Sequence, residues 1–168
     1  MVAQVTPSPA IHVLAADYAN AAHAAALVDM LNHYASDPAG GGEPLSSEAR
    51  QNLVPELAAR PQAFSVLAFH GQLAVGLVNC IEGFSTFKAR PLVNVHDVAV
   101  RSGYRGQGIA GMMLSLAESM ARERKACKLT LEVLEGNRSA QRLYATLGYV
   151  PYQLDPAMGA AQFLQKWL

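Results

Sequence analysis

A glycine-rich turn in the middle of the chain separates two runs with different periodicity. Before it, residues 92–100 (LVNVHDVAV) are rich in β-branched side chains, which is typical of a strand. After it, apolar residues at 109, 112, 113, 116 and 120 follow the spacing of an amphipathic helix. The turn itself, residues 101–108 (RSGYRGQG), holds three glycines. A helix that starts directly after such a turn can present main-chain amides to a phosphate group.

The rest of the chain predicts further strands and helices around this turn. Strands are expected at 10–14, 64–70, 73–81, 92–100 and 128–133, with two closing strands near 149 and at 162–168; helices are expected at 17–34, 46–60, 109–120 and 137–147. Two long connections, 36–45 and 82–91, are expected to be irregular because they are rich in glycine and proline. This order predicts a single α/β (α+β) domain over 1–168, with a mixed sheet of about seven strands and helices on both faces.

Composition narrows the classes of partner. The chain has 13 basic and 13 acidic residues, which argues against a nucleic-acid binder that works through a broad basic face. No stretch reads as a secretory signal or a membrane span, so we expect a cytoplasmic protein without a membrane partner. Two cysteines, Cys80 and Cys127, are too few for a disulfide framework and are expected to be reduced thiols.

Three phosphate-binding patterns come close to matching the turn. Gly103 and Gly108 have P-loop spacing, but residues 109–110 are Ile-Ala where that loop needs Lys and Ser or Thr. Residues 106–111 match the GxGxxG fingerprint of dinucleotide folds, yet too little chain follows them to complete such a domain. The third pattern, R-x-x-G-x-A, runs from Arg105 to Ala110 and meets neither objection.

A second segment supports the third pattern independently. Residues 137–149 read N-x-x-A-x-x-L-Y-x-x-x-G-Y, and one predicted helix and one predicted strand separate them from the first motif. With both motifs in this order, residues 92–152 resemble the Gcn5-related N-acetyltransferases (GNAT). The N-terminal half resembles that superfamily only in the order of its elements.

The resemblance implies a mostly antiparallel sheet that splays in the middle and holds acetyl-CoA as acyl donor. The pantetheine arm would bond to backbone groups of Val98, Ala99 and Val100, and the diphosphate would bind at the turn. Asn137 and Tyr144 would contact the pantetheine and the sulfur. The implied residues of the turn are Arg105, Gly106, Gln107, Gly108, Ile109 and Ala110.

The resemblance also implies the catalytic groups. Tyr144 is expected to protonate the departing thiolate as a general acid. Strict alternation would put Asn94, His96, Val98 and Val100 on one face of their strand, and His96 is our candidate for the general base that accepts the amine proton. Glu132, or a water chain without a dedicated base, remains an alternative.

The acceptor is expected near the two irregular connections. Glu43, Glu82, Phe84 and Phe87 are candidates to line its site, since an acidic group suits a cationic amine. We expect direct attack by a small-molecule primary amine in a ternary complex, with no metal and with a possible homodimer. A non-catalytic acyl-CoA-binding or sensing module and a protein N-acetyltransferase are the alternatives.

Overall fold

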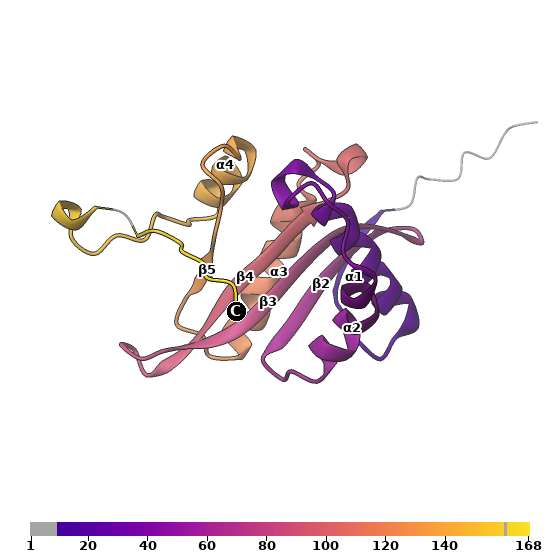
Figure 1. Ribbon diagram of the computed structural model, residues 1–168, viewed down its shortest axis with the longest axis horizontal. Helices are drawn as coiled ribbons and strands as arrows, with labels where there is room; N and C mark the ends of the chain where they lie inside the picture. Colours follow the sequence, from indigo (N-terminus) through magenta and orange to yellow (C-terminus); the bar gives the residue numbers. More distant parts are fainter. Residues whose placement is uncertain (1–9, 160) are drawn as a thin grey trace, which may run out of the picture. The chain divides into compact units, whose positions relative to one another are not determined.

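The computed structural model describes residues 10–159 and 161–168, which divide into two compact units between Leu131 and Glu132. Over its described residues, the first unit has one sheet in the order β1-β2-β3-β4-β5. Strands β1 to β4 are antiparallel to their neighbours and β5 is parallel to β4, so the predicted mixed, mostly antiparallel sheet is confirmed with five strands instead of about seven (Figure 1). The elements are β1 (Ile11–Ala15), α1 (Ala21–Ala35), η1 (Pro38–Gly40), α2 (Ser47–Ala58), β2 (Ala63–His70), β3 (Leu73–Ser85), β4 (Arg90–Val100), η2 (Ser102–Tyr104), α3 (Ile109–Glu123) and β5 (Leu129–Leu131).

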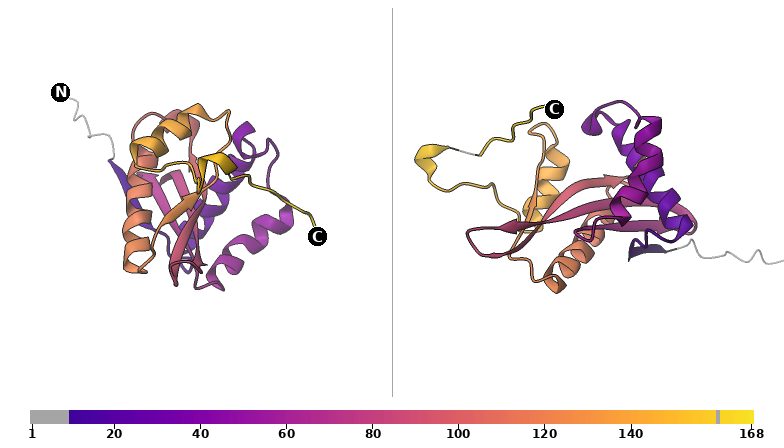
Figure 2. Two further views of the ribbon diagram at one scale, coloured as in Figure 1. Left: turned by 90° about the vertical axis from the view of Figure 1, so that its left-hand side faces the viewer. Right: turned by 60° about the horizontal axis from the view of Figure 1, so that its bottom comes forward.

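Helices cover both faces of this sheet, as predicted. On one face, Leu77 of β3 lies in a buried cluster with Leu27 and Met30 of α1. On the other, a Cβ atom added to Gly76 would lie 2.7 Å from the Met113 sulfur of α3. Because successive residues of a strand point to opposite faces, α1 and α3 lie on opposite sides. The left view of Figure 2 shows the strands between α3 and the pair α1 and α2.

Helix α3 buries one stripe along its length. Ile109, Met113, Ala117 and Ala121 are buried, at a spacing of four residues. The helix was predicted from its apolar periodicity, but Met112 of the expected stripe is exposed. The close approach of α3 to Gly76 favours small or flexible side chains along the buried face.

The expected loop at 82–91 is largely strand. Strand β3 continues to Ser85 and β4 begins at Arg90, with Glu82 opposite Val93 and Phe84 opposite Pro91. Glycine and proline in this segment indicated a loop, but cross-strand pairing satisfies its backbone. Only residues 86–89 form the turn of this long hairpin.

The two predicted closing strands are absent from the described residues. The second unit holds α4 (Arg138–Thr146) and η3 (Pro156–Met158), and its described residues 147–159 and 161–168 contain no strand. Two prolines, Pro151 and Pro156, cannot donate backbone hydrogen bonds to a ladder. Asp155 also accepts a bond from the Ala157 amide, which favours a local turn over an extended strand.

Candidate functional site

The edge of β4 opens beyond its middle. Strand β5 pairs with β4 only at Val93, Asn94 and Val95. Further along, β4 keeps β3 on one side and pairs with no described strand on the other. The predicted splay is therefore present, and it leaves the backbone of residues 98–100 along an open edge, where an extended ligand could add as a strand.

A β-bulge at His96 marks the start of this open edge. Asn79 lies opposite Asp97, whereas the next residue of β3, Cys80, lies opposite Val95, so His96 is the extra residue. The predicted strict alternation is wrong for this reason. Asn94, Asp97 and Ala99 share the face of α1, whereas Val98 and Val100 share the face of α3.

The glycine turn leads from this edge to the first turn of α3. Gly106 and Gly108 have φ angles of +77° and +79°, which a residue with a Cβ atom rarely adopts. A Cβ atom at either position would meet no protein atom of the described residues within 4 Å, so the space in front of the turn is open. Gly108 is the N-cap of α3 and offers no side-chain cap. The first amides of α3, from Ile109 and Ala110, therefore remain donors for an anion.

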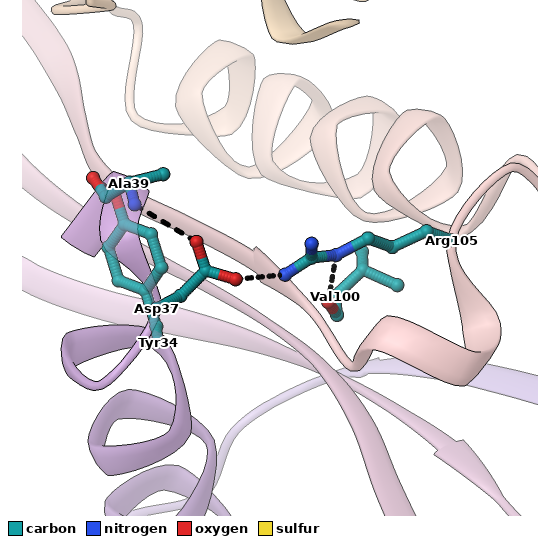
Figure 3. Close-up of polar contacts among 5 residues, drawn as sticks. All are labelled: Tyr34, Asp37, Ala39, Val100 and Arg105. Atoms are coloured by element: carbon teal, nitrogen blue, oxygen red, sulfur yellow. Dashed lines mark hydrogen bonds and ion pairs between the residues drawn. The ribbon is translucent and has the colours of Figure 1, made fainter. Parts of the chain in front are cut away.

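Arg105 links the turn to the connection after α1 (Figure 3). Its Nε donates to the Val100 carbonyl at 3.0 Å, and its Nη2 lies 2.7 Å from Asp37 Oδ2. The other oxygen of Asp37 accepts the Ala39 amide at 2.9 Å, and the Tyr34 hydroxyl donates to the Ala39 carbonyl at 3.4 Å. The guanidinium is thus held by a carbonyl and a carboxylate beside the start of α3.

The charge of Arg105 acts directly on Asp37. Its hydrogen bond, helped by the Ala39 amide, lowers the pKa of the Asp37 carboxyl below its ordinary value. The carboxylate is therefore ionised throughout the neutral range. Burial, and secondarily the charges of Asp97 and Asp37, raise the pKa of Tyr34, so that phenol stays neutral.

The other predicted residues of the first unit lie on several different elements. His96 is exposed on β4 and Glu43 is exposed after η1. Glu82 pairs with Arg124 at 3.2 Å. Phe84 and Phe87 are exposed at the far end of the β3–β4 hairpin. Val93, opposite Glu82, is about 23 Å along β4 from Val100 at the usual rise per residue.

Three predicted residues belong to the second unit: Asn137, Tyr144 and the alternative base Glu132. Asn137 caps α4, because its Oδ1 accepts the Ala140 amide at 3.2 Å, and Gly148 ends the helix region with φ +88°. Tyr144 is buried, with its ring centroid 5.7 Å from that of Tyr149. The predicted short helix is confirmed, and the catalytic roles of Tyr144 and His96 stay predictions.

A line of buried polar side chains crosses the sheet, and no motif of the sequence indicated it. The Tyr18 hydroxyl lies 2.9 Å from Ser65 Oγ, which donates to Asn79 Oδ1 at 2.6 Å. The Asn79 amide then donates to Asp97 Oδ2 at 3.0 Å. The available signal was one polar residue inside each of two apolar runs, AFSVLAF and LAVGLVNCI.

The described residues show neither a metal centre nor a membrane span. Within 10–159 and 161–168, no three His, Cys, Asp or Glu side chains are grouped so that they could hold a metal ion. No helix in the same part of the chain has the length and apolar character needed to cross a bilayer.

Comparisons with known proteins agree with the fold. Streptothricin acetyltransferase of Streptomyces lavendulae is 34% identical over 89 residues, which are 51% of this chain and 47% of that protein. Thialysine N-epsilon-acetyltransferase of Bos taurus is 33% identical over 78 residues, which are 46% of this chain and 45% of that protein. The chain thus matches about half the length of each of these relatives.

The fold matches along almost the whole chain. The crystal structure of a probable acetyltransferase has a TM-score of 0.78 at 20% identity, covering 93% of this chain and 98% of that one. The sequence profile of the acetyltransferase (GNAT) family matches residues 24–149, which include both motifs. The resemblance predicted from the two motifs is therefore confirmed, and the chain belongs to the acetyltransferase (GNAT) family.

Proposed function

We propose that the chain transfers an acetyl group from acetyl-CoA to a primary amine of a small molecule. The observation that carries this proposal is the uncapped start of α3, reached through a glycine turn with open space before it. The open edge of β4 lies directly before that turn in the chain. Two relatives named for the acetylation of streptothricin and thialysine support an amine as the acceptor.

In this proposal the turn binds the diphosphate of the donor. The amides of residues 106–110 donate to it, the dipole of α3 favours its negative charge, and Arg105 adds a cation. Backbone groups of residues 98–100 bond the pantetheine arm as an added strand. Asn137 contacts the same arm or a water molecule that is bound to it.

The chemistry is direct attack within a ternary complex. The neutral amine nitrogen forms a bond to the thioester carbon, and the carbon–sulfur bond then breaks. His96 accepts the proton that the amine loses, and the Tyr144 phenol gives a proton to the departing thiolate. No covalent enzyme intermediate and no metal are required.

The proposal treats residues 1–168 as one acetyltransferase domain that acts in the cytoplasm on a small-molecule acceptor. It includes no nucleic-acid or membrane partner. Apolar residues near the C-terminus, among them Phe163 and Trp167, are exposed and are candidates for a homodimer contact.

Thiol release from acetyl-CoA, with product mass measured, tests this function. The amine panel is streptothricin, thialysine, 1,4-diaminobutane and n-butylamine. We expect turnover with at least one amine, and a loss of about 10²-fold or more in kcat for Tyr144→Phe. Tyr152→Phe, which removes an exposed phenol of the same unit, should leave kcat unchanged.

Three results would contradict the proposal. A melting shift with CoA but no turnover, with Tyr144→Phe without effect, indicates a binding or sensing module. Acetylation of protein amines alone indicates a protein N-acetyltransferase. Saturable NADH fluorescence without a CoA-induced melting shift indicates a dinucleotide fold.

A further inference from the structure

A chain of polar side chains crosses the interior of the sheet where apolar packing would be expected. Ser65 and Asn79 are only 1% and 4% exposed. Polar groups this deeply buried are costly unless each finds a hydrogen-bond partner. Here each does, in a line that runs from Tyr18 through Ser65 and Asn79 to Asp97. This line of hydrogen bonds ends at the Asp97 carboxylate.

The direction of every hydrogen bond in this line is fixed by chemistry. Ser65 gives its one hydroxyl proton to Asn79, so Tyr18 must be the donor to Ser65. The Asn79 amide donates in turn to Asp97 Oδ2. All the donors therefore point towards Asp97. This arrangement fixes the orientation of the Asp97 carboxylate.

Among the described residues Asp97 has no counter-ion, unlike three carboxylates of the first unit that pair with arginines from distant positions of the chain. Asp29 pairs with Arg101, Asp37 with Arg105, and Glu82 with Arg124. Within residues 10–159 and 161–168, no cationic group forms an ion pair with Asp97, and its Oδ1 accepts no hydrogen bond. An oriented, half-buried carboxylate with one open oxygen is suited to bind a cation that arrives from solution.

The place of Asp97 in β4 connects it with the proposed reaction. It directly follows the bulge at His96 and directly precedes Val98, on the open edge that the proposed function assigns to the pantetheine arm. Its side chain lies on the face of α1, whereas Val98 faces α3. An acceptor on the α1 face would meet this carboxylate next to the reacting thioester.

We propose that Asp97 binds a second cationic nitrogen of the acceptor, and that Asn79, Ser65 and Tyr18 position it. The inference rests on the proposed function and names its substrate class, amines that carry two cationic groups. The reacting amine must be neutral when it attacks, so a carboxylate interacts best with a nitrogen that keeps its charge throughout. Asp97 is then a specificity-determining residue, and the three others act through it.

The test compares 1,4-diaminobutane with n-butylamine, which have the same carbon chain but differ by one ammonium group. We expect native protein to favour the diamine in kcat/KM by about 10- to 100-fold. Asp97→Asn should reduce this ratio to near one, mainly through KM. Tyr18→Phe, which removes only the distant hydroxyl, should lower the ratio several-fold. Glu118→Gln, an exposed carboxylate paired with Arg122, should leave it unchanged.

A CoA-induced melting shift in each variant shows that the fold and donor site are intact. The inference is overturned if native protein acetylates both amines with similar kcat/KM, or if Asp97→Asn keeps the native ratio. It is also overturned if Tyr18→Phe and Glu118→Gln behave alike. If native protein acetylates no amine of the panel, the proposed function fails and the inference falls with it.

Discussion

Replacing Asp37 with asparagine removes the carboxylate that pairs with Arg105 beside the start of α3. In the free protein the guanidinium donates to Asp37 at 2.7 Å and to the Val100 carbonyl at 3.0 Å. A diphosphate at the turn has to draw Arg105 from Asp37, or else lie beside a second negative charge. We therefore expect Asp37→Asn to bind CoA more tightly than the native protein.

The size of this gain follows from the exposure of the pair. The side chains of Arg105 and Asp37 are 52% and 21% exposed, so solvent screens their attraction. Such pairs contribute about 0.2–1 kcal/mol. Because Asp37→Asn does not have to break this pair when CoA binds, its Kd for CoA should be about 1.5- to 5-fold lower than that of the native protein. Arg105→Ala loses a charged contact with the diphosphate and should raise Kd by about tenfold or more.

Titration calorimetry with CoA at low and high salt measures these changes. The gain from Asp37→Asn should shrink at high salt, since screening weakens exposed charges, and it should be largely absent when Arg105→Ala is already present. The pKa of Asp37 is lowered in the folded protein, so its carboxylate is fully ionised above the ordinary aspartate pKa. The gain in CoA affinity from Asp37→Asn should therefore be fully present there and should be lost only as the pH falls through the lowered pKa.

Weaker CoA binding by Asp37→Asn at low salt would refute this reasoning. So would an equal gain in the native and Arg105→Ala backgrounds, because Arg105 would then not be the group for which Asp37 competes. Glu56→Gln removes an exposed carboxylate that pairs with Arg60 on α2, and it should leave Kd unchanged.

Two further predictions concern an added Cβ atom at Gly108 and the thiol of Cys80. Gly108→Ala places a Cβ atom at φ +79° in front of α3, so it should lower the stability of the fold by about 1–2 kcal/mol and raise the Kd for CoA. Gly71→Ala, at φ +61° in the β2–β3 turn, is the control: it should lower stability by a similar amount in thermal melting and leave the Kd for CoA unchanged. Cys80 is buried, and burial raises the pKa of its thiol to about 12. At pH 7.5 a thiol reagent should therefore label the half-buried Cys127 in folded protein, and Cys80 only after unfolding. Rapid labelling of Cys80 in the native state would contradict this expectation.

Local patterns in the sequence were sufficient for the elements around the site. The helix from Ile109, the β2–β3 hairpin and the Asn137 cap each depend on residues within a few positions of one another. The start of α1 shows how narrow such margins are. Asp17 stands at the start of the helix expected over 17–34, but Asn20 accepts the Ala22 amide and the helix begins at Ala21. Both residue types cap helices well, so the sequence alone does not choose between them.

Contacts between distant parts of the chain could not be predicted. Arg105 and Asp37 are 68 positions apart, and no local pattern indicates that one would hold the other. The two closing strands were predicted but are absent from the described residues, again because of distant parts of the chain. A short apolar segment forms a strand only if a partner strand is available, and the described residues near the C-terminus pair with none.

The bulge at His96 shows how one residue separates a correct strand from a wrong assignment of its faces. Without the extra residue, alternation from Val95 would turn Asp97 towards α3, on the side of Gly76 and Met113, where an ionised group would be costly. With it, Asp97 turns to the face of Asn79 and completes the polar chain. No sequence pattern marks the bulged position itself, because the bulge depends on contacts of β4 with Asn79 of the neighbouring strand β3. The buried Asn79 therefore fixes the register of β4, and the same contact determines which side chain stands next to the open edge.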